Sequence, residues 1–127
     1  MRATHKKILA SLLVLIMVLS VAAPAFAASP LEVKVPVKIV ETGSVAPGKT
    51  YQVVLKANDL SNPMPDGSTN GEFVLTEEAG SYTIPLSFSE VGFYYYTVFQ
   101  KAGTDPLADY DETVYDLTVT VFFAEDG

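Results

Sequence analysis

Lys38 lies in the stretch VPVKIVETG, residues 35–43, the first strand-like run after an apolar N-terminal segment. A lysine that faces the interior of a β-sandwich is desolvated and can become a neutral nucleophile that forms a covalent cross-link, whereas an outward lysine is an ordinary solvated charge. The alternation of the run places Ile39 on the apolar face with Val35 and Val37, and Lys38 on the opposite face. We therefore predict an inward Ile39 and an outward Lys38.

The N-terminal segment has the three parts of a signal peptide. MRATHKK is basic, ILASLLVLIMVLSVAA is an apolar run too short to span a membrane comfortably, and AFA ends in a small-x-small pattern. We predict a signal peptide over residues 1–27, cleavage after Ala27, and one domain over residues 28–127, secreted or retained at the cell surface. The alternative is an uncleaved membrane anchor.

Charge and composition exclude several functions for the predicted mature chain. It keeps five of the eight basic residues and all fifteen acidic ones, a net charge of −10, which argues against nucleic acid and anionic membranes as partners. The chain has no cysteine, and its one histidine, His5, belongs to the predicted leader. Zinc sites, thiol nucleophiles and histidine-based triads are therefore not expected, and neither is a cofactor.

Acidic residues cluster in two loops and could supply oxygen ligands to calcium. The clusters are Asp105, Asp109, Asp111 and Glu112, and Asp59, Asp66 and Glu72. Calcium takes six to eight oxygen ligands, and neither cluster has the spacing of an EF-hand. We interpret both as solvated loop charge and predict no metal site.

Period-two alternation predicts strands throughout the mature chain. The predicted strands lie in LEVKVPVKIV, TYQVVLKA, EFVL, SYTIPLSFS, FYYYTVFQK and TVYDLTVTVFF, separated by turn-forming stretches such as APGK and NDLSNPMPDGSTNG. No helix is predicted after the leader. The expected fold is an all-β, immunoglobulin-like antiparallel β-sandwich of about six to seven strands.

The aromatic strand FYYYTVF admits two interpretations. Its tyrosines can pack in the core and across strands, or they can form a platform for sugars. Only Phe93, Tyr95 and Phe99 share the phase that can face outward, and together they would form an exposed aromatic stripe. Lys34, Lys49 and Lys101 are interpreted as free surface lysines.

Four stretches, in this order, resemble the streptococcal pilin isopeptide-linkage domain family of Gram-positive surface proteins and pili: VPVKIVETG, NPMPDGS, GFYYYTVFQ and YDETVYDLTVTV. They span nearly all of the mature chain. The resemblance implies an immunoglobulin-like sandwich. It also implies a mechanism in which a buried lysine of the first strand attacks an asparagine of the last strand, while a buried acid moves the proton.

This sequence departs from the family pattern at each reactive position. Counted from Pro36, the lysine position falls on Ile39, and counted from Gly92, the acid position falls on Gln100. The acceptor asparagine has no counterpart before the final AEDG. We predict a domain that keeps the fold without the amide bond. The alternative is a one-residue register slip, for example at a β-bulge, that turns Lys38 inward as the donor.

A sandwich of this type without a final strand would have an open apolar edge. Two explanations stand: the sequence is a truncated form of a longer product, or the edge accepts a strand from a partner. The expected function is a non-enzymatic structural or adhesive module of a Gram-positive surface or pilus-like protein, with other surface proteins or extracellular ligands as partners. The alternatives are a secreted module that binds carbohydrate or protein, and a hydrolase with paired carboxylates.

Overall fold

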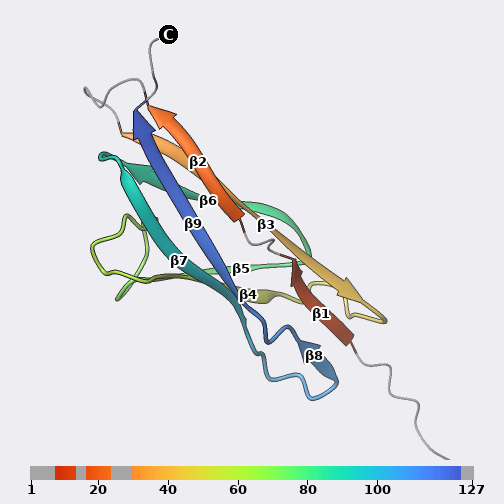
Figure 1. Cartoon of the computed structure of the whole chain (residues 1–127). Helices are drawn as coiled ribbons and strands as arrows, with labels where there is room; N and C mark the ends of the chain where they lie inside the picture. The colour runs from red at the N-terminus through yellow and green to blue at the C-terminus, as the bar shows by residue number, and fades with distance from the viewer. Residues whose placement is uncertain (1–7, 14–16, 24–29, 124–127) are drawn as a thin grey trace, which may run out of the picture.

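A computed structural model describes residues 8–13, 17–23 and 30–123, and within these ranges the chain forms strands and no helix. The strands are β1 (Ile8–Leu13), β2 (Met17–Ala23), β3 (Leu31–Thr42), β4 (Tyr51–Ala57), β5 (Glu72–Glu77), β6 (Gly80–Phe88), β7 (Gly92–Lys101), β8 (Ala108–Tyr110) and β9 (Val114–Phe123). Figure 1 shows their arrangement.

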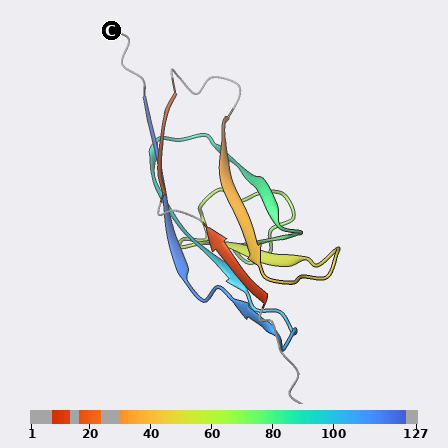
Figure 2. The ribbon, with the colours of Figure 1, turned by 90° about the vertical axis from the view of Figure 1, so that its right-hand side faces the viewer.

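The strands form two sheets. One sheet has the order β6-β3-β1-β8, and the other has the order β2-β9-β7-β4-β5. Figure 2 shows the two layers from the side, with β3 (orange) in one and β9 (blue) in the other. The strand pairs within residues 30–123 are antiparallel, namely β3–β6, β4–β5, β4–β7 and β7–β9. The predicted all-β sandwich is confirmed.

The core lies between the sheets and follows from the alternation. In β3 every second side chain is buried, from Val33 to Ile39, and the intervening residues are exposed. The largest fully buried side chains include Tyr51, Tyr96 and Phe88. Each large apolar side chain removed from water contributes roughly 1.5–3 kcal/mol, so in a chain without cysteine this packing is the main source of stability.

Two tyrosines fix the starts of β6 and β7 in the same way. The Tyr82 hydroxyl donates a hydrogen bond to the carbonyl of Glu78 at 2.9 Å, and the Tyr94 hydroxyl donates to the carbonyl of Glu90 at 2.7 Å. The sequences EAGSY and EVGFY therefore form equivalent corners, in which a side chain caps the turn that precedes its own strand. The Tyr94 ring also lies 4.7 Å from the Phe88 ring, which couples the two strands.

The structure adds three strands to the expected set. β8 lies in the segment that was predicted to be an acidic loop, because its three residues pair with β1. β1 and β2 lie inside residues 1–27, which were expected to be outside the fold, and they pair with the sandwich. Cleavage after Ala27 concerns a position outside the described residues and remains a prediction, and His5 and the AEDG end also lie outside them.

Candidate functional site

The interior position near the end of β3 is occupied by Ile39, whose side chain is 3% exposed. Lys38 is exposed on the other face of the strand, where its backbone pairs with Ser81 of β6. The predicted directions of the two side chains are confirmed. Lys38 is solvated, and its register shows no slip that would bring it inward.

Gln100 is buried near the end of β7, with 7% of its surface exposed. Its Oε1 accepts a hydrogen bond from the backbone amide of Asp111 at 2.9 Å. The side chain therefore ties β7 to the segment between β8 and β9. A carboxamide has no proton to shuttle at ordinary pH, so the role that this geometry supports is structural.

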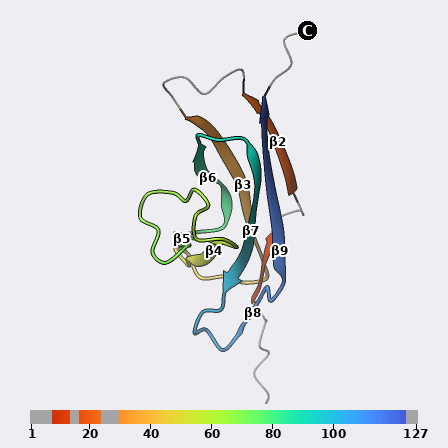
Figure 3. The same cartoon turned by 60° about the vertical axis from the view of Figure 1, so that its left-hand side comes forward.

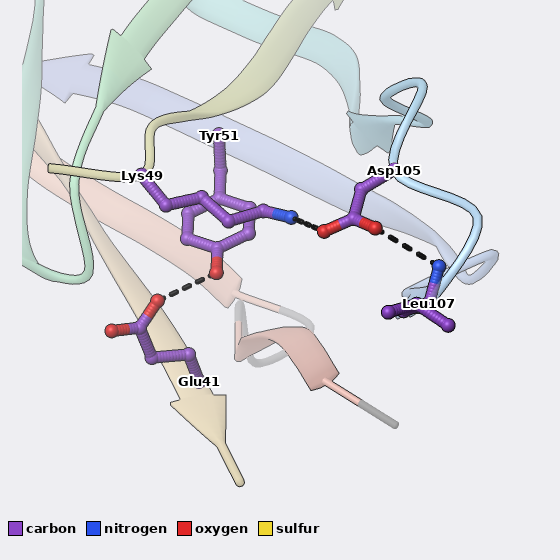
Figure 4. Close-up of polar contacts among 5 residues, drawn as sticks. All are labelled: Glu41, Lys49, Tyr51, Asp105 and Leu107. Carbon is purple, nitrogen blue, oxygen red and sulfur yellow. Dashed lines mark hydrogen bonds and ion pairs between the residues drawn. The ribbon is translucent and has the colours of Figure 1, made fainter. Parts of the chain in front are cut away.

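A polar cluster at the end of the sandwich joins residues far apart in the sequence (Figure 4). Lys49 precedes β4, and its Nζ lies 2.5 Å from Oδ2 of Asp105, a residue of the loop between β7 and β8. The other carboxylate oxygen of Asp105 accepts a hydrogen bond from the Leu107 amide at 2.9 Å. The expectation that Lys49 is a free surface lysine is wrong, because the loop after β7 folds back and pairs with it.

Aromatic rings surround this lysine. Its Nζ lies 5.9 Å from the centroid of the Tyr51 ring and 5.7 Å from that of Tyr110, within reach of cation–π attraction. The Tyr51 hydroxyl donates a hydrogen bond to Oε2 of Glu41 at 2.6 Å. One cluster thus connects the end of β3, the start of β4 and the loop before β8.

The electrostatics of the cluster favour the ion pair over covalent chemistry. The hydrogen bond from Lys49 lowers the pKa of the Asp105 carboxyl, and the same bond raises the pKa of Lys49. Burial raises the pKa of the Tyr51 hydroxyl, and Glu41 raises it further. A protonated lysine has no lone pair for attack, so Lys49 and Asp105 act as an ionic tie between two loops rather than as an amide-forming pair.

The acidic loops use several of their carboxylates in local turns. Asp59 Oδ1 accepts hydrogen bonds from the backbone amide and the hydroxyl of Ser61. Asp111 accepts from the Thr113 amide at 2.9 Å and from the Tyr115 hydroxyl at 2.6 Å. Within residues 30–122, whose side chains are described, no three acids or histidines gather in a geometry that could hold a metal ion.

The aromatic stripe lies on the outer face of the second sheet. Phe93 is 67% exposed and Tyr95 is 51% exposed, whereas Phe99 is half-buried. Phe93 pairs with Thr120 and Tyr95 with Thr118, so threonines of β9 flank the rings. The predicted outward direction is confirmed for Phe93 and Tyr95, and these two rings form the exposed part of the stripe.

Sequence reasoning missed the Lys49 cluster because its pairing depends on how two loops meet. Only the mixture of tyrosine, lysine and acids near the turn APGK and in the loop after β7 could have suggested it. Comparison with known proteins gives no further assignment, because no family model and no curated protein matches the chain. Within the described ranges, no helix is long and apolar enough to cross a membrane.

Proposed function

We propose that this protein is an exported, non-enzymatic structural or adhesive module of a Gram-positive cell surface, held together by packing rather than by an internal amide bond. The observation that carries the proposal is that two neighbouring side chains of β3 point in opposite directions. Ile39 occupies the interior position, and the neighbouring ammonium of Lys38 is in water. A packed aliphatic side chain at this position leaves no nucleophile for a cross-link between β3 and a last strand.

Gln100 supports the same proposal. In the pilin-linkage family that the sequence resembles, the equivalent position carries the acid that moves a proton. Here an amide side chain is buried and accepts a backbone hydrogen bond instead. A buried polar group with a satisfied partner stabilises a fold and needs no reactive role.

The mass of the exported protein tests this proposal. The gene is expressed in a Gram-positive host, and the product is examined by intact-mass measurement and N-terminal sequencing. We expect the mass of residues 28–127 without loss of any small molecule. A deficit of one ammonia would reveal a lysine–asparagine bond, a deficit of one water would reveal a lysine–carboxylate bond, and either result would overturn the packing-only fold.

Variants of the lysines locate any bond that does form. Lys38→Ala tests the register-slip alternative, and Lys49→Ala tests the lysine that is paired with Asp105. A deficit that disappears in one of these variants identifies the donor. We expect the mass of both variants to differ from that of the wild type only by the substitution.

A second function is favoured by the exposed rings of Phe93 and Tyr95, which form an aromatic patch on the outer face of the second sheet. Such a patch suits the stacking of a sugar ring or an apolar protein contact. A glycan array with the wild type and with Phe93→Ala/Tyr95→Ala tests it. The matched control is Lys34→Ala/Thr83→Ala, which alters exposed side chains on the other sheet. Binding that only the aromatic variant loses would establish a binding module.

A further inference from the structure

One apolar segment of the chain contributes a strand to each sheet. β1 pairs antiparallel with β3, from Leu9 opposite Thr42 to Leu13 opposite Lys38. β2 pairs parallel with β9, from Met17 opposite Leu117 to Ala23 opposite Phe123. Figure 3 shows β2 alongside β9. We call the position that these two strands occupy the strand slot.

The strand slot runs along β3 and β9, two strands that would be sheet edges if β1 and β2 were absent. Without these two strands, β3 would keep only β6 as a neighbour, and β9 would keep only β7. An edge strand presents unpaired N–H and C=O groups that readily pair with another extended peptide. Beneath the slot, Leu117, Val119 and Val121 face the core and are at most 2% exposed with the slot filled.

The segment in the slot is uncharged, but it is preceded by basic residues. Residues 8–23 contain no charged side chain, and Lys6 and Lys7 come directly before them. β1 enters the slot with Ile8 opposite Ala108 of β8. The chain around β8 carries the acidic cluster of Asp105, Asp109, Asp111 and Glu112. Lys49 compensates one of these four charges through its pair with Asp105, and the cluster stays net negative, so a basic end that enters the slot here meets opposite charge.

We infer that the strand slot is an acceptor site. Once residues 1–27 are removed, the slot binds an extended apolar strand from another polypeptide. This strand has a basic end, which lies beside β8, and it runs antiparallel to β3 and then parallel to β9. Main-chain hydrogen bonds along β9 and β3 provide the affinity, and the acidic cluster selects the orientation. This inference rests on the leader cleavage within the proposed function.

The test uses the processed chain recovered from the medium, mixed with a fluorescent peptide of residues 1–23 as the probe. We expect one peptide per chain by gel filtration and saturable binding by anisotropy. Replacing Lys6 and Lys7 of the peptide with glutamine should weaken binding at low salt and make little difference at high salt. If the processed chain is degraded before isolation, the folded full chain is cut at a protease site placed within residues 24–29, and exchange of the labelled peptide is followed.

Single prolines in the peptide separate strand pairing from simple hydrophobic adsorption. Consecutive residues of a strand point their N–H groups to opposite sides, so one of Val18→Pro and Leu19→Pro must remove a hydrogen bond to β9. We expect that peptide to bind about tenfold more weakly or worse. The controls Val18→Ala and Leu19→Ala keep the backbone donor, so the affected proline peptide should bind about tenfold more weakly than the alanine peptide at the same position.

Any of the following outcomes would overturn the inference that the strand slot is an acceptor site. If the processed chain is folded and monomeric but does not bind the peptide, the slot closes without an added strand. A processed chain that forms stable dimers shows that a second copy is the occupant. Equal binding by both proline peptides shows adsorption. In these three cases the exported module remains as proposed, whereas an exported chain that keeps residues 1–27 overturns the signal-peptide prediction and leaves the slot filled by its own segment.

Discussion

Ile39 and Lys38 are neighbours in sequence with opposite surroundings, which makes them a matched pair for mutation. Ile39→Lys places an ammonium in the apolar core, and we expect it to lower the free energy of unfolding by about 3 kcal/mol or more. Lys38→Gln changes an exposed side chain and should change it by about 0.5 kcal/mol or less. Urea unfolding of both variants measures the difference. Similar losses in the two variants would contradict the assigned directions.

Gln100 holds the segment before β9 through one hydrogen bond. Gln100→Ala leaves the Asp111 amide without this partner and removes buried volume, so we expect a loss of about 1–3 kcal/mol. Gln52→Ala, an exposed glutamine on β4, is the control and should have little effect. Thermal unfolding compares the two, and an unaffected Gln100→Ala would show that the hydrogen bond is not needed.

The ion pair of Lys49 and Asp105 makes stability depend on pH on the acid side. Lys49 lowers the pKa of Asp105 in the folded state, so this stabilisation is present above the ordinary aspartate pKa of 3.8 and is lost as the pH falls through the folded value. Asp105→Asn should therefore be less stable than the wild type at neutral pH and lose less on acidification. Lys49→Gln should likewise reduce the loss of unfolding free energy as the pH falls. Unfolding curves from pH 7 to about pH 2 measure this loss. If both variants lose as much stability on acidification as the wild type, the ion pair is not the source of the pH dependence.

At the scale of the strands, the corner before β7 can be tested by removing a single oxygen atom, the hydroxyl of Tyr94. Tyr94→Phe removes the hydroxyl that bonds to the Glu90 carbonyl but keeps the ring against Phe88. We expect a loss of about 0.5–1.5 kcal/mol in the free energy of unfolding. Tyr82→Phe removes the equivalent bond before β6 and should have an effect of similar size. If neither variant is destabilised, the two corners do not hold their strands.

The sequence predicted the strands whose inner and outer residues alternate, because one buried face leaves a period-two pattern. This pattern located β3, β4, β6, β7 and β9 and the inward direction of Ile39. β8 was missed because three residues in a polar loop carry no such pattern. β1 and β2 were missed because a continuous apolar run has no alternation and has the form of a leader. The contact between Lys49 and Asp105 spans 56 residues and depends on loop geometry, which no local pattern encodes.

For the molecule as a whole, the structure predicts a change in protection when residues 1–27 are removed. Hydrogen exchange is compared between the full chain and the processed chain. Amides of Leu117–Phe123 that point toward β2 should exchange about tenfold faster or more after removal, whereas the β4–β7 pair should keep its protection. A uniform change across all strands would show general destabilisation instead of an opened slot.

The parallel pairing of β2 with β9 has a mechanical consequence. The start of β2 lies beside Leu117 and its end beside Phe123, so the start of one strand and the end of the other lie at opposite ends of the ladder. Tension applied between those two points pulls along the strands and stretches the evenly spaced hydrogen bonds together. A peptide held in this way resists shear along its length better than peeling from one end.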